Sequence, residues 1–113
     1  MKIYIAAPYE MRQVAVSAMK ELEARGDEIT STWLKQLDEE GEKSARQDLE
    51  DIYRADVLLA INPESWRRKG GGGRHAEFGY ALALGKKMVL LGVRSHIFHH
   101  LREVRMIQNV GEL

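Results

Sequence analysis

The chain lacks several features that would place it in a class at once. It contains no cysteine, which excludes disulfide bonds, thiolate nucleophiles and cysteine metal sites. Its 17 basic residues balance 17 acidic residues, so no net charge drives a general attraction to nucleic acid or to an anionic membrane. No apolar run approaches the roughly 18 residues of a transmembrane helix, and the N-terminus lacks the pattern of a secretion signal. We therefore expect a cytoplasmic protein that binds a small molecule rather than nucleic acid or membrane.

The length of the chain limits the number of domains that it can form. Its 113 residues suffice for one domain, spanning residues 1–113, but are few for an enzyme that acts alone. We therefore expect a homodimer or a higher homo-oligomer. No motif for a cofactor is present, and we expect none.

Strand and helix patterns alternate along the whole sequence. The expected helices are one with apolar positions at Val14, Ala15, Ala18, Met19 and Leu22, one over 44–55 with Leu49 and Ile52 facing inward, and one after the glycine run 70–73. The expected strands are 2–7, 28–33 at an edge, 57–61, 88–93 and 104–107. This alternation indicates an α/β fold: one doubly wound, flavodoxin-like or Rossmann-like domain with a mainly parallel sheet of about five strands. We expect no closing helix after the last strand, and a sheet face left uncovered there favours self-association.

We expect the strand order 2-1-3-4-5, which places ligands beyond the carboxyl ends of strands 1 and 3. Several familiar α/β chemistries are missing at that edge. The first strand-to-helix turn has no glycine, Gly73 is followed by Arg74 rather than by a Lys-Ser or Lys-Thr pair, and no Gly-x-Ser-x-Gly sequence occurs. A site centred on carboxylates remains.

Glu77 is the leading candidate for the reacting group of that site. We expect it in the first turn of the helix that follows the glycines, where the helix dipole would stabilise its ionised, nucleophilic form. The same position also suits a glutamate with a purely structural role. The buried phenol of Tyr4 requires a partner such as a carboxylate. Asp48 shares a helix face with Ile52 and is expected to be half-buried, whereas Glu50 and Asp51 read as solvent-facing charges.

Other residues near the same edge are expected to bind substrate: Pro8, Arg12, Asn62, Gly71, Gly72, Gly73, Arg74 and His75. The glycines allow close approach of the backbone to a ligand, and Arg74 supplies a cation. We expect no metal site, because His96, His99 and His100 are interleaved with apolar residues and have no acid nearby at ligand spacing.

With these residues assembled in order, the chain resembles the nucleoside 2-deoxyribosyltransferase family and its sister group, the deoxynucleoside 5'-monophosphate N-glycosidases. The similarity spans nearly the whole chain. It rests on Ile3-Tyr4-Ile5-Ala6, on Asp48-Leu49 with Ala55-Asp56-Val57, and on Glu77-Phe78-Gly79-Tyr80-Ala81 followed by Gly85-Lys86.

The resemblance implies cleavage of the N-glycosidic bond of a nucleoside or its 5'-monophosphate. It implies that Glu77 attacks the anomeric carbon, that Tyr4 holds this carboxylate, and that Asp48 positions the sugar or transfers a proton. Pro8 departs from the pattern, because related monophosphate hydrolases place a phosphate-binding serine there. Glycines with Arg74 and His75 replace a hydroxyl-bearing loop before the glutamate, so hydrolase and transferase both stay open.

Two other functions are alternatives to this interpretation. A phosphoribohydrolase of the cytokinin-activating type also pairs a glycine-rich loop with a glutamate, but its Pro-Gly-Gly entry and the threonine before the glutamate are absent here. A nucleotide-binding sensor that keeps the pocket without turnover is the alternative from another class.

Overall fold

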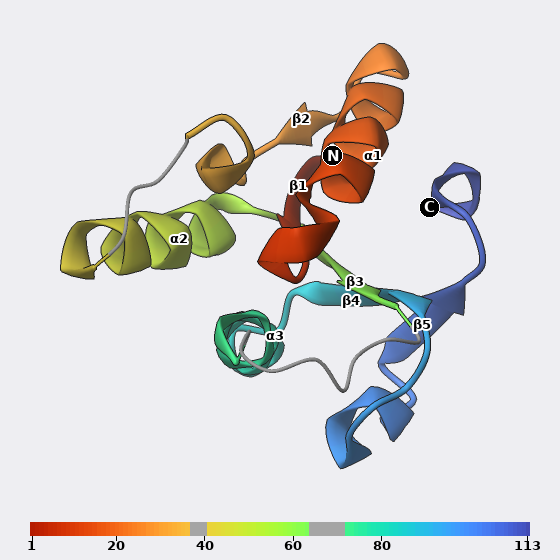
Figure 1. Cartoon of the computed structure of the whole chain (residues 1–113). Helices are drawn as coiled ribbons and strands as arrows, with labels where there is room; N and C mark the ends of the chain where they lie inside the picture. Colours follow the sequence, from red (N-terminus) through yellow and green to blue (C-terminus); the bar gives the residue numbers. More distant parts are fainter. Residues whose placement is uncertain (37–40, 64–71) are drawn as a thin grey trace.

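A computed structural model describes residues 1–36, 41–63 and 72–113 of the chain. Within these residues, strands and α-helices alternate as expected (Figure 1). The strands are β1 (Lys2–Ala6), β2 (Glu28–Ile29), β3 (Val57–Asn62), β4 (Lys87–Gly92) and β5 (Val104–Ile107). The α-helices are α1 (Arg12–Ala24), α2 (Glu42–Arg54) and α3 (Gly73–Ala83). Short 3-10 turns are η1 (Tyr9–Met11), η2 (Thr32–Leu34), η3 (Ile97–His100) and η4 (Val110–Glu112).

The strands form one parallel sheet in the order β2-β1-β3-β4-β5, which confirms the predicted α/β fold and strand order. β3 lies in the middle and is buried along its whole length, as its continuous apolar sequence indicates. Because the strands are parallel, their carboxyl ends share one edge. The segments that leave this edge are the ones in which a doubly wound sheet builds its ligand site.

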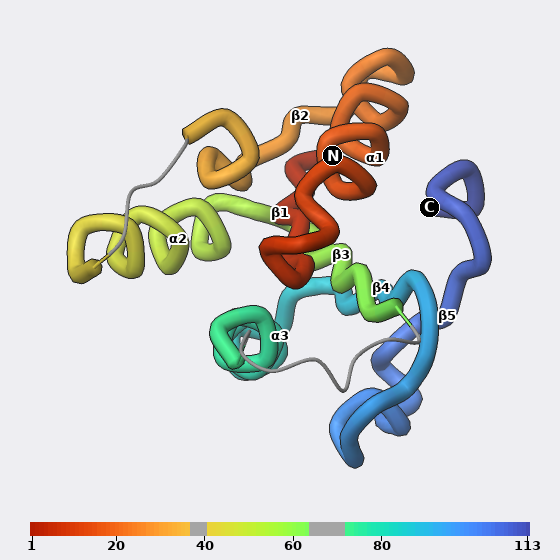
Figure 2. Tube along the Cα trace, viewed as in Figure 1, coloured from red at the N-terminus to blue at the C-terminus, as the bar shows by residue number. Residues whose placement is uncertain are grey.

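The two faces of the sheet have separate hydrophobic cores. Ile3, Ile5 and Leu59 face α1, whereas Tyr4, Leu58 and Leu90 face α2 and α3. Successive residues of a strand point to opposite faces, so Tyr4 belongs to the helical layer that carries both Asp48 and Glu77. The trace shows α1 on one side of the sheet and α2 with α3 on the other (Figure 2).

Some details differ from the sequence-based expectations. The edge strand β2 is shorter than predicted, because the chain turns at Thr30, whose hydroxyl donates to the backbone oxygen of Asp51 at 2.9 Å. Val14 and Leu49 were expected to face inward and are instead 43% and 44% exposed. Among the described residues, the chain after β5 forms only the short turn η4, as expected, and Val110 in this turn packs into the core on the α1 side.

One close approach fixes the end of β4. Gly92 pairs with Asn62 of β3 and has a φ of 119°, a backbone conformation that favours glycine. A Cβ atom at this position would lie 2.0 Å from the backbone oxygen of Asn62. A side chain is therefore excluded at the carboxyl edge of the two central strands.

Candidate active site

A cavity of about 580 Å³ opens at the carboxyl edge of β1. Four parts of the chain line it: the segment after β1, the turn η2 with Gln36 just after it, the helix α2 and the start of α3. Its volume lies within the range of small-molecule sites. The lining residues are Ala7, Pro8, Tyr9, Trp33, Gln36, Ser44, Ala45, Asp48, Leu49, Gly73, Arg74, Ala76 and Glu77.

Tyr4 and Glu77 meet beneath this cavity. The hydroxyl of Tyr4, a wholly buried residue of β1, donates a hydrogen bond to Oε2 of Glu77 on α3. Burial raises the pKa of the Tyr4 hydroxyl, and the charge of Glu77 raises it further, so the phenol keeps its proton and remains a donor. The carboxylate partner that the sequence requires for Tyr4 is therefore Glu77.

Asp48 faces Glu77 from α2. The two carboxyl groups lie within hydrogen-bonding reach of each other, on a half-buried part of the cavity wall. Burial raises the pKa of Glu77 to about 7, and the charge of Asp48 adds to this effect while the Tyr4 hydrogen bond opposes it. Burial also raises the pKa of Asp48. Two neighbouring carboxyl groups whose pKa values are both raised suit one group for nucleophilic attack and the other for proton transfer.

Two expectations for Glu77 were wrong: its place in the first turn of the helix, and a pKa that favours the ionised form. Helix α3 begins at Gly73, which places Glu77 in the second turn, and the first turn carries no acid. The dipole effect falls off within the first turn. Burial and the neighbouring carboxylate dominate instead, and they favour the protonated form of Glu77.

Asp51 was also predicted wrongly, because it is fully buried rather than solvent-facing. Its Oδ2 accepts hydrogen bonds from the backbone nitrogen and the hydroxyl of Thr32, at 3.0 and 2.7 Å. Its Oδ1 accepts hydrogen bonds from Gln47 at 2.9 Å and from Arg54 at 3.3 Å. Asp51 thus fastens α2, which carries Asp48, to the turn η2.

That turn supplies one wall of the cavity. The indole Nε1 of Trp33 donates to the backbone oxygen of Ile5 at 2.8 Å, which holds the ring over the end of β1. The side chain of Arg12 donates to the backbone oxygen of Leu34, so it braces the same turn and does not line the cavity. Sequence reasoning missed Trp33, although an aromatic residue at the end of a predicted edge strand was a usable signal.

The other predicted substrate-binding residues separate into two groups. Pro8, Gly73 and Arg74 line the large cavity, and exposed Gly72 lies next to it at the start of α3. Asn62 and His75 line a much smaller cavity on the other side of Arg74, where the amide oxygen of Asn62 accepts a hydrogen bond from Arg74 at 3.2 Å. Gly71 lies outside the described residues.

The fold of this chain is similar to that of known proteins. No protein-family model and no curated protein sequence matches the chain. Among solved structures, the chain is similar to the CMP N-glycosidase BcmB of Clostridium botulinum, with a TM-score of 0.68 and 20% identity over 99% of this chain and 93% of that one. It is also similar to a 2-deoxyribosyltransferase from Leishmania mexicana, with a TM-score of 0.65 and 18% identity over 96% of this chain and 75% of that one. At these identities the likeness establishes the fold. Within the described residues, no helix is long and apolar enough to cross a membrane.

Proposed function

We propose that this chain is an enzyme that cleaves the N-glycosidic bond of a nucleoside or deoxynucleoside, or of its 5'-monophosphate. The observation that carries the proposal is the carboxyl group of Glu77, held by Tyr4 and faced by Asp48 at the wall of a cavity of about 580 Å³. The two structural neighbours support it, since one is named a CMP N-glycosidase and the other a 2-deoxyribosyltransferase. Tyr4, Asp48 and Glu77, to which the resemblance gives roles in the reaction, lie next to one another here.

In the proposed reaction Glu77 is the nucleophile. Tyr4 holds Oε2, so we assign the attack on the anomeric carbon to Oε1. The bond between this carbon and the base nitrogen breaks, and its electron pair leaves with the base. The transition state has oxocarbenium character, which the adjacent carboxylate stabilises before a glycosyl ester forms.

Asp48 supplies the proton that the departing base takes up. Burial raises the pKa of Asp48, which favours the protonated form that a general acid needs. The proton passes from Asp48, or from a group that Asp48 organises, to the leaving nitrogen. Water or an acceptor base then attacks the anomeric carbon, the Asp48 carboxylate takes up the proton that the attacking group loses, and the bond to Glu77 breaks to release its carboxylate. Hydrolysis and transfer differ only in this second step.

The start of α3 is the proposed position of a 5'-phosphate. Gly73 and Arg74 line the cavity there, at the N-terminal end of the helix, where backbone N–H groups favour an anion. The guanidinium of Arg74 adds a charged donor. Together they replace the serine that Pro8 excludes after β1.

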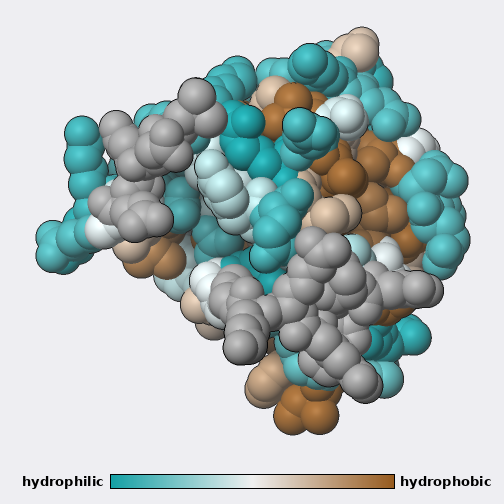
Figure 3. Space-filling view, viewed as in Figure 1, coloured by the Kyte–Doolittle hydropathy of each residue, from teal (hydrophilic) through white to brown (hydrophobic). Residues whose placement is uncertain are grey.

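The compartment, the cofactor requirement and the assembly of the protein belong to the same proposal. We propose that residues 1–113 act as one nucleoside 2-deoxyribosyltransferase-like domain in the cytoplasm, without a cofactor, as a homodimer or higher homo-oligomer. Hydrophobic residues gather at the surface between α1 and the C-terminal turn η4 (Figure 3). Light scattering at micromolar concentration tests the assembly, and a monomeric mass would contradict it.

A substrate panel tests the reaction. The protein is incubated with nucleosides, deoxynucleosides and their 5'-monophosphates, with and without a free acceptor base, and chromatography measures the released base. Intact-mass analysis of a rapidly quenched reaction tests for the glycosyl ester on Glu77. We expect Glu77→Gln to slow base release about 1,000-fold or more, and Asp48→Asn about 100- to 10,000-fold.

Glu50→Gln is the matched control, because Glu50 is an exposed acid on the same helix as Asp48. It should leave the rate unchanged. Base release by Glu77→Gln at the parent rate would refute the mechanism. Tight stoichiometric binding of a nucleotide without any base release would instead indicate a sensor.

A further inference from the structure

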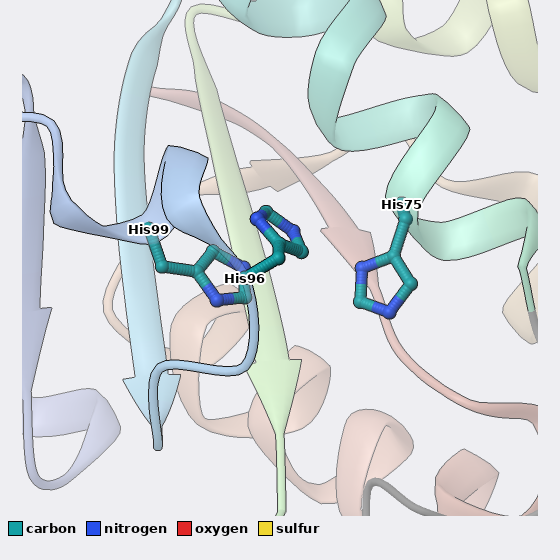
Figure 4. Close-up of side chains that lie close together, drawn as sticks. All are labelled: His75, His96 and His99. Atoms are coloured by element: carbon teal, nitrogen blue, oxygen red, sulfur yellow. The ribbon is translucent and has the colours of Figure 1, made fainter.

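Three histidines from two separate segments converge beside α3. His75 lies in the first turn of that helix, His96 directly precedes η3, and His99 lies within η3. One ring nitrogen from each can be chosen so that all three lie within 4.8 Å of one another (Figure 4). The expectation of no metal site considered His96 and His99 together with the exposed His100. It missed His75, which lies 21 positions before His96 in the chain.

Packing holds the rings close together. His96 and His99 stack with their centroids 3.7 Å apart, and His75 meets His96 edge-on at 4.9 Å. The buried ring of Phe78 contacts His96 and His99 at centroid distances of 5.5 and 5.0 Å. Contacts with Phe78 and between the rings themselves therefore bring the three imidazoles together.

The imidazoles are in the form that binds metal ions. Burial lowers the pKa of each of the three, to about 4 for His99, and the positive charge of Arg74 contributes to the lowering. They are neutral at pH 7, as metal ligation requires. The buried Nδ1 of His96 has no hydrogen-bond partner among residues 1–36, 41–63 and 72–113. A buried polar atom without a partner is costly, and a metal ion at this nitrogen would remove that cost.

The geometry points to a site for one divalent first-row transition-metal ion of the Zn²⁺ type, held by His75, His96 and His99. Imidazole nitrogens suit zinc, copper and nickel, and three of them leave one position of a tetrahedron for water or an anion. Zinc to nitrogen distances of about 2.0–2.1 Å place tetrahedral ligands about 3.3 Å apart, so the partly exposed rings of His75 and His96 must move closer on binding.

Two features oppose metal binding at this site and limit its affinity. The guanidinium of Arg74 is a nearby positive charge. In addition, the backbone N–H of Ser95 donates to Nδ1 of His99 at 2.9 Å. A metal on Nδ1 takes this acceptor directly, and a metal on Nε2 moves the ring proton to Nδ1. In both cases the Ser95 amide loses its acceptor, so we infer moderate affinity and a specific signal for occupancy.

This site is separate from the proposed reaction. None of the three histidines lines the large cavity that holds Glu77. An ion here would fasten the start of α3 to η3, joining segments that are 21 residues apart in the chain. Metal binding and base release can therefore fail independently of each other.

Calorimetry with Zn²⁺ on tag-free, chelator-treated protein tests the proposal. We expect one Zn²⁺ per chain, a thermal transition raised by Zn²⁺, and a visible absorption band with Co²⁺ typical of tetrahedral coordination. His75→Ala and His96→Ala should weaken binding by more than the roughly 10- to 100-fold that loss of an outer partner of a metal ligand costs. His100→Ala is the matched control from the same segment and should bind as the parent does.

Nuclear magnetic resonance supplies a test that needs no variant. The amide signal of Ser95 should shift on addition of one equivalent of Zn²⁺. The proposal is overturned if no stoichiometric Zn²⁺ binds, if His100→Ala weakens binding as much as His96→Ala, or if the Ser95 amide is unmoved when the protein is saturated.

Discussion

The hydroxyl of Tyr4 donates to Oε2 of Glu77 across 73 positions of the chain. This bond joins β1, an interior strand of the sheet, to the second turn of α3. It is the contact that favours the ionised form of Glu77, in a setting where burial and Asp48 favour the protonated form. The acidity of Glu77 is therefore a balance that single substitutions can shift.

Tyr4→Phe tests this balance with almost no change in shape. A hydrogen bond to a charged group contributes roughly 1.5–3 kcal/mol, so we expect base release to slow about 10- to 100-fold. The acid limb of the pH–rate profile should also move to higher pH, because Glu77 loses the donor that lowers its pKa. The measurement is kcat against pH for both proteins. An unchanged acid limb would show that the Tyr4 hydroxyl does not set the ionisation of Glu77.

The raised pKa of Glu77 predicts a pH dependence of stability. Between its ordinary value of 4.5 and the folded value of about 7, the folded state holds the proton more tightly than the unfolded state. The stabilising contribution is thus complete below pH 4.5 and is lost as pH rises through about 7. Glu77→Gln should therefore be more stable than the parent above pH 7, by on the order of 1–3 kcal/mol.

Urea unfolding at pH 5 and at pH 8 measures this difference. The gain for Glu77→Gln should be larger at pH 8, and Glu50→Gln should show no such gain. A gain of equal size at both values would place the cause elsewhere than in the ionisation of Glu77.

Asp51→Asn tests the anchor between α2 and η2. An amide presents one oxygen where the carboxylate presents two, so either the Thr32 contacts or the Gln47 and Arg54 contacts lose their acceptor. We expect a loss of about 2–4 kcal/mol in the free energy of unfolding. We also expect a raised KM, because Trp33 and Asp48 on the cavity wall depend on this junction. A variant as stable as the parent would contradict the structural role of Asp51.

Gly92→Ala and Gly79→Ala should have opposite effects. The added methyl group at Gly92 meets the Asn62 backbone oxygen at 2.0 Å in a left-handed backbone conformation, so we expect a loss of about 3 kcal/mol or more. Gly79 lies inside α3 with nothing within 4 Å of an added Cβ, so alanine should stabilise the helix by about 0.5–1 kcal/mol. Thermal unfolding of both variants gives the comparison. A neutral Gly92→Ala would show that the ends of β3 and β4 can separate.

The strands and their order could be predicted because parallel strands carry strong local signals. Val57-Leu58-Leu59-Ala60-Ile61 is apolar throughout, and the structure buries every one of these residues. The same burial explains Tyr4, whose phenol requires a partner wherever its strand lies in the sheet. These inferences need only the chain's own periodicity and general rules for doubly wound sheets.

Two of the errors concern features that depend on contacts between distant segments. Asp48 and Asp51 are three residues apart on one helix face, so periodicity alone does not say which of them is the more buried. Thr32, which lies 19 positions before Asp51, decides this. The histidine cluster likewise needed His75 next to His96, and no pattern within either segment predicts that contact.

The two acids of the site stand on different helices, Asp48 on α2 and Glu77 on α3. Their mutual influence therefore depends on how closely these helices pack, through core residues such as Ile52 and Ala81. Substitutions that slightly change side-chain volume between α2 and α3 would therefore shift the pH range in which the site is active, while both acids stay in place. Selection for activity at a new pH would then be expected to enrich substitutions between the helices rather than in the cavity itself.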